Sequence, residues 1–208
     1  GSRYAVIVRK GTINYEGVGA LYLEGKLVPG TDGAMDITFS PDGKHYALRC
    51  KNAEARTFFM VIDGKAGTEY QGVAEKVSWS PDSTKAIYQI SNSGRNFVVV
   101  NNTEEFGTGL VGSLTRDPIV FATTGSRYAF SSIDGSNRNF LTIVDGKNVL
   151  PAGFSPIGDT LDFSDDGSRY AMMMNVAGRN DSGGLLIDGT LNNDLSPGLF
   201  GGTNWMNP

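Results

Sequence analysis

Short apolar runs, separated by Gly, Asn, Asp and Pro, recur along the whole chain at a nearly constant spacing. The segment Gly1-Ser2-Arg3-Tyr4-Ala5 returns unchanged at residues 125–129 and at residues 167–171. Degenerate copies of the same segment begin at Gly43 and Ser83. The repeats therefore start at residues 1, 43, 83, 125 and 167, and each is 40 or 42 residues long. Self-similarity at such a period predicts one structural unit per repeat.

Each repeat carries the same series of strand signals. An apolar run follows the repeat start, at residues 4–8, 46–48, 86–88, 128–130 and 170–174. A second run ends in an acidic-Gly or Asn-Asn turn, at residues 21–25, 59–64, 97–102, 141–146 and 185–189. A weaker segment punctuated by Gly or Pro comes next, as at residues 27–30, 149–151 and 195–198. The last run ends in an aromatic residue, at Phe39, Trp79, Phe121, Phe163 and Trp205. Such runs between turn residues indicate strands, and no stretch shows a capped helical period.

Four strands repeated about every 40–45 residues are the sequence pattern of a β-propeller. We therefore predict an all-β fold: one five-bladed β-propeller with four-stranded antiparallel blades, forming a single domain over residues 1–208. The C-terminal segment from Trp205 to Pro208, followed by Gly1, has the same length as residues 39–43. We expect the C-terminal strand to pair with the N-terminal blade, which closes the ring and removes an exposed sheet edge.

The turns of three repeats resemble a known family. Residues 39–44 (Phe-Ser-Pro-Asp-Gly-Lys) and 79–82 (Trp-Ser-Pro-Asp) look like the hallmark turn of TolB-type, WD-like β-propeller repeats, and residues 163–167 are a near copy. Residues 61–70 resemble the third-strand turn of many bacterial members. The resemblance implies a protein-interaction scaffold, often periplasmic or surface-associated, or a propeller that gates an attached peptidase. The peptidase alternative is disfavoured, because the chain has neither a peptidase domain nor a Gly-x-Ser-x-Gly elbow.

Composition narrows the class of protein. Hydrophobic residues make up 39% and charged residues 19%, as in a globular rather than a disordered chain. The formal net charge of −4 disfavours nucleic-acid binding, and the longest apolar runs, such as residues 58–62, are too short for membrane insertion. One Cys and one His exclude an intrachain disulfide and a multi-His metal site. We expect no metal and no cofactor.

An arginine recurs between the first and second strand signals of every repeat, at Arg9, Arg56, Arg95, Arg138 and Arg179. Three of these arginines precede an asparagine, at Asn96, Asn139 and Asn180. In a pseudo-symmetric propeller these side chains form a ring on one face, where Arg binds carboxylate, phosphate or sulfate and Asn binds sugar hydroxyls. The alternative is that each Arg caps its own turn or pairs with a neighbouring carboxylate, after duplication of one ancestral repeat.

A second basic position recurs near the Asp-rich turns, on the opposite face of the predicted propeller. Its members are Arg3, His45, Lys85, Arg127 and Arg169. We expect local ion pairs there, which contribute little when exposed. The carboxylates of Asp42, Asp82, Asp165 and Asp166 are expected to stabilise turns rather than bind calcium. The aromatic side chains at the ends of the innermost strands, Trp79 and Trp205 included, are expected to fill the core between blades.

Catalysis is a third possibility, because some five-bladed propellers are glycosidases that use two carboxylates about 5–9.5 Å apart. Asp36 and Asp162 fall on predicted innermost strands, and Asp117 and Asp159 lead into them. The short connections leave little loop for a substrate pocket, so we predict no catalytic residue.

Three further features have ordinary explanations. His45 has no Ser or Cys partner at a recognisable spacing, and Cys50, on a predicted strand, is expected to be a small buried residue. Two glycosylation sequons begin at Asn101 and Asn180, at predicted turns. They matter only if the chain reaches a glycosylating compartment.

The sequence thus predicts a binding or scaffold propeller without catalytic machinery. The first hypothesis is a module for protein–protein interaction or assembly, periplasmic, secreted or on the cell surface, although the N-terminus shows no signal-peptide pattern. The second is a lectin-like binder of acidic glycans, and the third is a small glycosidase. The expected partner is a protein or a glycan, with the domain able to serve as one part of a larger assembly.

Overall fold

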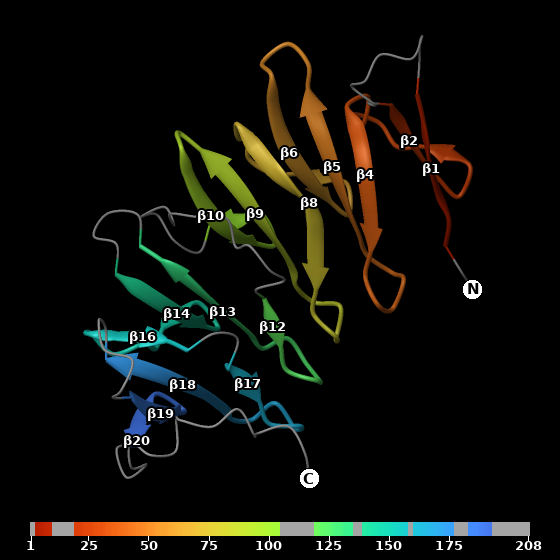
Figure 1. Cartoon of the computed structure of the whole chain (residues 1–208). Coiled ribbons are helices and arrows are strands. Elements are labelled where there is room, and N and C mark those ends of the chain that lie inside the picture. Colours follow the sequence, from red (N-terminus) through yellow and green to blue (C-terminus); the bar gives the residue numbers. More distant parts are fainter. Residues whose placement is uncertain are drawn as a thin grey trace. The chain divides into compact units, whose positions relative to one another are not determined.

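The computed structural model describes residues 3–9, 19–104, 119–134, 139–157, 160–176 and 183–192. These residues form antiparallel β-sheets and no helix (Figure 1), so the all-β prediction is confirmed for them. The chain divides into two compact units, Gly1–Val111 and Gly112–Pro208. Within the described ranges, no helix exists that is long and apolar enough to span a membrane.

The first unit contains three sheets in chain order. The first sheet has three strands, β1 (Ala5–Val8), β2 (Ala20–Leu23) and β3 (Lys26–Leu27). The second sheet has four strands, β4 (Ala34–Phe39), β5 (Tyr46–Asn52), β6 (Thr57–Ile62) and β7 (Lys65–Ala66). The third sheet repeats this order with β8 (Gly72–Trp79), β9 (Ala86–Asn92), β10 (Arg95–Val100) and β11 (Thr103–Glu104).

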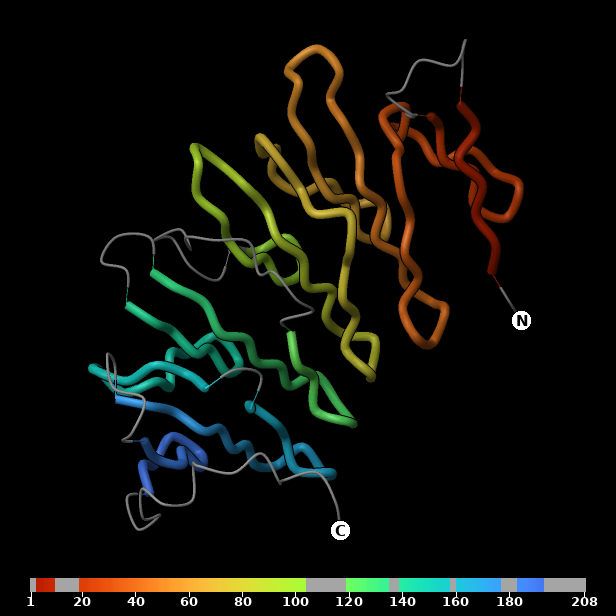
Figure 2. Tube along the Cα trace, viewed as in Figure 1, coloured from red at the N-terminus to blue at the C-terminus, as the bar shows by residue number. Residues whose placement is uncertain are grey.

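The second unit contains two sheets with the same strand order. The fourth sheet consists of β12 (Val120–Phe121), β13 (Tyr128–Ile133), β14 (Phe140–Val144) and β15 (Lys147–Asn148). In the fifth sheet, β16 (Phe154–Pro156) and β17 (Asp162–Phe163) both pair with β18 (Tyr170–Val176), which continues into β19 (Gly183–Ile187) and β20 (Thr190–Asn192). The tube in Figure 2 shows the same turn and hairpin recurring from sheet to sheet.

Tight two-residue turns join the last two strands of each sheet. In the second sheet this turn is Asp63-Gly64, with φ of 48° and 80°, a conformation that Gly adopts at no steric cost. The pairs Glu24-Gly25, Asn101-Asn102, Asp145-Gly146 and Asp188-Gly189 have the same left-handed backbone. Because the turn is so short, the last strand begins directly after it, as β3, β7 and β15 do. The sequence patterns at residues 27–30 and 149–151 therefore place this strand too late in the chain, and the pattern at residues 195–198 lies outside the described residues.

Successive side chains along β5 face alternately the first sheet and the third sheet. In β5, Leu48 and Cys50 pack with Leu21 of the first sheet, whereas Ala47 packs with Tyr88 of the third. The same alternation places Met172 and Met174 of β18 against Ala129 and Val144 of the fourth sheet. The apolar core of each unit therefore lies between consecutive sheets, as the strand period of two requires.

The predicted ring is only partly covered by the described residues. The repeated strand order is confirmed in five sheets, and the first sheet has three strands where the second, third and fourth have four. The segment predicted to complete the first sheet, around Trp205, lies outside the described residues. The five-bladed closure and the single domain over residues 1–208 therefore stay predictions.

Candidate functional site

A serine and an aspartate close the turn that leads from the innermost strand to the next one. In the second sheet, Ser40 Oγ donates to Asp42 Oδ1 (2.6 Å), and that oxygen also accepts the Lys44 N–H (3.0 Å). Ser40 Oγ in turn accepts the His45 N–H at 3.0 Å. The third sheet repeats this arrangement with Ser80 and Asp82, and the fifth with Ser164 and Asp166.

These contacts confirm the expected turn role of Asp42, Asp82 and Asp166. The Ser40 hydroxyl and the Lys44 N–H hold the pKa of Asp42 well below its usual range. The corresponding donors from Ser164 and Ser168 lower the pKa of Asp166 to about 2. Asp165 takes the place of the proline and is exposed. In the described ranges, no group of three or more His, Cys, Asp or Glu side chains lies close enough to hold a metal ion.

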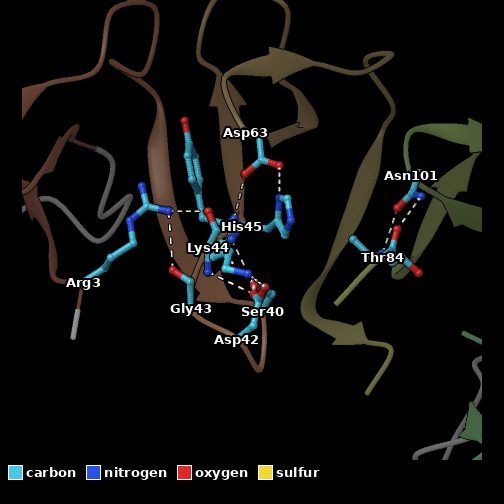
Figure 3. Close-up of polar contacts among 11 residues, drawn as sticks. Arg3, Ser40, Asp42, Gly43, Lys44, His45, Asp63, Thr84 and Asn101 are labelled. Atoms are coloured by element: carbon cyan, nitrogen blue, oxygen red, sulfur yellow. Dashed lines mark hydrogen bonds and ion pairs between the residues drawn. The ribbon is translucent and has the colours of Figure 1, made fainter. Parts of the chain in front are cut away.

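The basic turn position, defined as Arg3, His45, Lys85, Arg127 and Arg169, lies at this end of the strands. Every member except Lys85 contacts the hairpin acid of its own sheet. Arg3 Nε lies 3.2 Å from Glu24 Oε1, and His45 Nδ1 lies 2.7 Å from Asp63 Oδ2 (Figure 3). Arg127 and Arg169 pair with Asp145 (2.7 Å) and Asp188 (2.8 Å). The other oxygen of each of these three Asp carboxylates accepts a backbone N–H at the start of the strand, from Tyr46, Tyr128 and Tyr170. The predicted local ion pairs are thus confirmed at Arg3, Arg127 and Arg169, and His45 makes the corresponding contact with Asp63.

Two of these arginines also reach the following sheet. Arg3 Nη1 donates to the carbonyl oxygen of Lys44, in the turn of the second sheet (Figure 3). Arg127 Nη1 donates to the carbonyl oxygens of Gly167 (2.9 Å) and Ser168 (2.8 Å), in the turn of the fifth sheet. One guanidinium therefore bonds its own hairpin and the next turn at once, which the fork geometry of Arg permits and an ammonium does not.

An aromatic ring from the next sheet completes this contact. The Arg3 guanidinium lies 5.8 Å from the centroid of Phe39, and that of Arg127 lies 5.1 Å from the centroid of Phe163. His45 stacks on Trp79, with ring centroids 6.2 Å apart and planes inclined by 26°. The aromatic residues at the ends of β4, β8 and β17 are thus packed against the basic residue of the preceding sheet. These contacts agree with the core role predicted for Trp79; Trp205 lies outside the described residues.

The third repeat departs from this arrangement. Its hairpin carries Asn101, whose Oδ1 accepts the Ala86 N–H (2.8 Å) and whose Nδ2 donates to the Thr84 carbonyl (3.0 Å, Figure 3). The amide keeps the bond to the start of the strand but offers no charge to Lys85. Asn101 is also the first predicted glycosylation residue. Because its amide is bonded on both sides, a glycan there has to displace the Thr84 contact; the second sequon, at Asn180, lies outside the described residues.

The His45–Asp63 pair has the distance of a catalytic dyad but the surroundings of a structural contact. Arginine occupies the same position in three other repeats and makes the same bond to an acid. The face of the imidazole is covered by Trp79. A residue that arginine replaces without loss of the contact is a structural cation, so this pair gives no support to nucleophilic catalysis.

The arginines of the predicted ring that the structure describes lie at the opposite end of the strands of the first unit. In the first unit, the tips of the β5–β6 and β9–β10 hairpins lie at the end away from turns 40–45 and 80–85 (Figure 1). Arg9, Arg56 and Arg95 are exposed there, and within the described part of the chain Arg9 and Arg56 form no ion pair. In the other unit, Asn139 is exposed. Arg138, Arg179 and Asn180 lie outside the described residues, and Asn96 is half-buried on β10.

The carboxylate of Glu69, next to the bridge between Tyr70 and Phe58 of β6, is bound by neutral donors. Glu69 accepts hydrogen bonds from the Thr57 hydroxyl and from Asn52 Nδ2 (3.0 Å). Both bonds hold the pKa of Glu69 below its usual range, and the bond from Thr57 has the larger effect. Arg56 itself adopts a left-handed backbone in the hairpin turn (φ of 56°). The idea that each Arg of the ring pairs with a carboxylate therefore finds no support at Arg56.

The residues considered for glycoside hydrolysis do not form a described pair. Asp36 on β4 is bound by Arg49, whose Nε lies 2.9 Å from Asp36 Oδ2. Asp162 begins β17 in the other unit, and Asp117 and Asp159 lie outside the described residues. The Asp36 carboxylate is therefore occupied by an ion pair within its own sheet. Burial raises the pKa of the Cys50 thiol to about 12, as expected for an inert core residue.

Comparison with known proteins places these sheets beside other propellers. No protein-family model matches the chain, and no curated protein matches it by sequence. The structure is similar to the β-propeller domain of the Trilobed protease from Pyrococcus furiosus, with 14% identity, a TM-score of 0.34, and coverage of 94% of this chain and 54% of that chain. It is similar to TolB from Acinetobacter baumannii (16% identity, TM-score 0.36, 92% and 52% covered). A TolB-type protein from Agrobacterium tumefaciens matches with 17% identity, a TM-score of 0.37, and 86% and 74% covered.

The chain spans about half the length of the first two of these structures. Two of these matches are proteins of the TolB type, to which the repeat turns were found similar. The strand order, the two-residue hairpins and the repeated turn contacts of this chain define its class only as an all-β protein built from repeated antiparallel sheets.

The inter-sheet contact of the basic turn position is the feature that sequence reasoning missed. We expected only local ion pairs there, whereas Arg3 and Arg127 bond the following sheet. A signal existed in the spacing, because Phe39, Phe121, Phe163 and Trp205 each come 36 residues after the basic residue, and Trp79 comes 34 residues after His45. A charge and an aromatic residue that recur together at one offset indicate a contact between successive repeats.

Proposed function

We propose that this chain is a closed five-bladed propeller that acts as a binding scaffold without catalytic machinery. Its ligand is an acidic protein surface, bound outside the cytoplasm. The observation that carries this proposal is the unequal use of charge at the two ends of the strands. At the turn end, basic groups are occupied by acids and by the next sheet, while Arg9 and Arg56 at the hairpin end are exposed and form no described ion pair.

The exposed face of the first sheet supports closure of the ring. Tyr4, Val6 and Val8 are 57%, 51% and 46% exposed. Their counterparts Tyr46, Leu48 and Cys50 in the second sheet are at most 6% exposed, because the first sheet covers them. An apolar strand face of this kind needs a preceding sheet, and ring closure supplies one from the same chain.

Binding at the hairpin end follows from the chemistry of arginine. An exposed guanidinium is only weakly hydrated, whereas it binds a carboxylate through two parallel hydrogen bonds. Several such groups at one end of stacked sheets present a cationic surface on a chain whose net charge is −4. We expect an acidic partner to associate in a salt-sensitive manner, since exposed charges are screened within about 8–10 Å at physiological ionic strength.

The test compares two classes of acidic probe at low and physiological salt. A fluorescent oligoglutamate peptide represents an acidic protein surface, and an array of neutral, sialylated and sulfated glycans represents the lectin alternative. The proposal predicts salt-sensitive binding of the peptide, weakened about tenfold or more in the Arg56→Glu/Arg95→Glu variant. Lys26→Glu, an exposed charge reversal on β3, is the matched control and should bind as the parent does.

Three outcomes contradict the scaffold proposal. Selective binding of one glycan class, lost in the same double variant, establishes the lectin alternative instead. Peptide binding that the double variant and the Lys26→Glu control weaken equally shows that only net charge matters. Turnover of a chromogenic glycoside, abolished by Asp36→Asn or Asp162→Asn, would overturn the assignment as a non-catalytic protein.

A further inference from the structure

One inter-sheet contact rests on a side chain whose charge changes near neutral pH. The basic turn position holds arginine in the first, fourth and fifth repeats and Lys85 in the third, but His45 in the second. Arginine and lysine stay protonated through the physiological range, whereas an ordinary imidazole loses its proton between about pH 5 and pH 8. The charge that the second sheet presents to the third therefore depends on pH.

The geometry around His45 matches that of the arginine contacts. Its Nδ1 lies 2.7 Å from Asp63 Oδ2 within the second sheet, and its ring stacks on Trp79 of the third sheet at 6.2 Å. Arg127 lies in the same way between Asp145 and Phe163. As an imidazolium, His45 reproduces both interactions, an ion pair and a cation over an aromatic ring. As a neutral imidazole it keeps at most the hydrogen bond and the ring contact.

The other charged groups near this contact are carboxylates, lysines and one arginine, side-chain types that ordinarily titrate outside the range from about pH 5 to pH 8. Those on the elements around His45 are Asp42 and Lys44 in its own turn, Asp63 and Lys65 in the β6–β7 hairpin, Arg3 from the first sheet, and Asp82 and Lys85 in the turn of the third sheet. Asp42 pairs with Lys44 at 3.5 Å, and the pKa of Asp42 is held far below this range. Arg3 is occupied by Glu24 and the Lys44 carbonyl. A titration seen here between pH 5 and pH 8 is thus attributable to His45.

We propose that His45, Asp63 and Trp79 form a pH-sensitive link between the second and third sheets. The link is strong while His45 is protonated and weakens as the pH rises through the titration of the imidazole. Its stabilising effect is therefore present on the acidic side of this range and lost on the alkaline side. The corresponding arginine contacts of the other repeats do not respond over the same range. This proposal stands independently of the binding function proposed above.

The most direct test follows the emission of Trp79, because a charge placed over an indole ring changes its fluorescence. Trp205→Phe leaves Trp79 as the sole tryptophan, and phenylalanine is the residue that three other repeats carry at this position. The proposal predicts a single sigmoidal change of Trp79 emission between about pH 5 and pH 8. Replacing His45 with arginine in this background should abolish the change, and Asp63→Asn should shift its midpoint toward lower pH.

A second measurement follows stability, with the denaturant midpoint at about pH 5.5 and about pH 8 as the readout. The midpoint of the parent protein should fall from the lower to the higher pH by more than that of His45→Arg. The matched control is Asp188→Asn, whose partner Arg169 keeps its charge, so its effect should be the same at both pH values. His45→Lys, which copies the third repeat, replaces His45→Arg if the arginine variant does not fold.

Emission that stays flat across this range in the folded Trp205→Phe protein overturns the proposal. The same is true of an unchanged transition in both His45→Arg and His45→Lys, since the titrating group is then another one. Equal pH dependence of the midpoint in the parent and in the arginine variant contradicts a link between the two sheets.

Discussion

At the scale of single residues, the turn carboxylates show how a short polar side chain specifies backbone shape. Asp42, Asp82 and Asp166 each accept a serine hydroxyl from two residues before and a backbone N–H from two residues after. These bonds hold the chain in the turn and favour the ionised form of the carboxyl. The lowered pKa of Asp166, about 2, is the electrostatic consequence of this geometry.

Asp166→Asn should therefore destabilise the protein at neutral pH. A carboxyl whose pKa is lowered on folding contributes stability above the pKa of the unfolded state, near 4, and loses it as the pH falls toward about 2. The difference in denaturant midpoint between parent and variant should shrink across that interval. Asp165→Asn, one residue earlier and exposed, is the control and should leave the midpoint unchanged at every pH. A constant difference for Asp166→Asn would show that its charge plays no part.

Trp79 carries a polar atom that the fold does not use. Its indole Nε1 is buried and has no hydrogen-bond partner among the described residues. Phe39 and Phe163 occupy the same position in other sheets. Trp79→Phe should change the free energy of unfolding by less than about 1.5 kcal/mol, because the lost apolar area is offset by removal of an unsatisfied donor. A loss of about 3 kcal/mol or more, as for truncation to alanine, would show that the indole N–H has a partner.

At the scale of elements, the basic turn position links the hairpin to the turn of the next sheet in two repeats, through Arg3 and Arg127. Arg127 makes the most complete contact, with Asp145, two carbonyl oxygens of the fifth sheet and the ring of Phe163. Arg169 is twice as exposed, and its described partner is Asp188. Arg127 thus makes an inter-sheet contact and Arg169 a local ion pair, so variants of the two residues distinguish the effects of these contacts.

Arg127→Gln should cost about 2 kcal/mol of stability, because it removes several charge-assisted bonds and leaves two carbonyl oxygens without their donor. Arg169→Gln, the matched control, should cost less than about 1 kcal/mol, as exposed ion pairs do. Chemical denaturation of both variants measures the difference. Arg127→Lys should recover only a minority of the loss, since an ammonium does not reach the hairpin and the next turn together. Equal losses for the two glutamine variants would contradict an inter-sheet role for Arg127.

The strands and turns were predictable because their causes are local. The Asp63-Gly64 hairpin, the Ser40–Asp42 turn and the apolar runs around Tyr46 and Tyr128 are each specified by neighbouring residues. The last strands of the sheets were predicted too late in the chain at residues 27–30 and 149–151. A two-residue strand such as β7 has no sequence pattern of its own, because only its pairing with β6 defines it. The contact of Arg127 with the following sheet was not predictable from either repeat alone, since its donors and acceptors lie 40 and 41 residues apart.

At the scale of the whole molecule, the register of the sheets gives the ring a definite test. The aromatic end of each innermost strand lies opposite the first residue of the next strand. The described pairs are Phe39 with Tyr46, Trp79 with Ala86, Phe121 with Tyr128, and Phe163 with Tyr170. If the C-terminal segment completes the first sheet, the same rule places Trp205 opposite Tyr4. The exposed face of β1 is then covered, as its counterparts are.

For the predicted arginine ring, the sequence predicted only the positions of the arginines. The repeat period placed Arg9, Arg56 and Arg95 at hairpin or loop ends, and all three are exposed there. The repeat sequence does not specify what such a surface binds, because duplication copies an arginine whether or not a ligand selects it. Binding depends on the sum of exposed charges at one end of the sheets, which the comparison of Arg56→Glu/Arg95→Glu with Lys26→Glu measures.

The most direct test of the closed propeller is a disulfide between residues 4 and 205. Opposite residues of antiparallel strands have Cβ atoms about 4.5–5.5 Å apart, near enough for a disulfide with small adjustments. In a Cys50→Ala background, Tyr4→Cys/Trp205→Cys should oxidise to a monomer with an internal cross-link, seen as faster migration in non-reducing electrophoresis. Val8→Cys/Trp205→Cys, displaced by about 13 Å along β1, should not form this bond. Cross-linked dimers or longer chains, or equal cross-linking of the two pairs, would contradict the ring and indicate open, head-to-tail stacking of sheets.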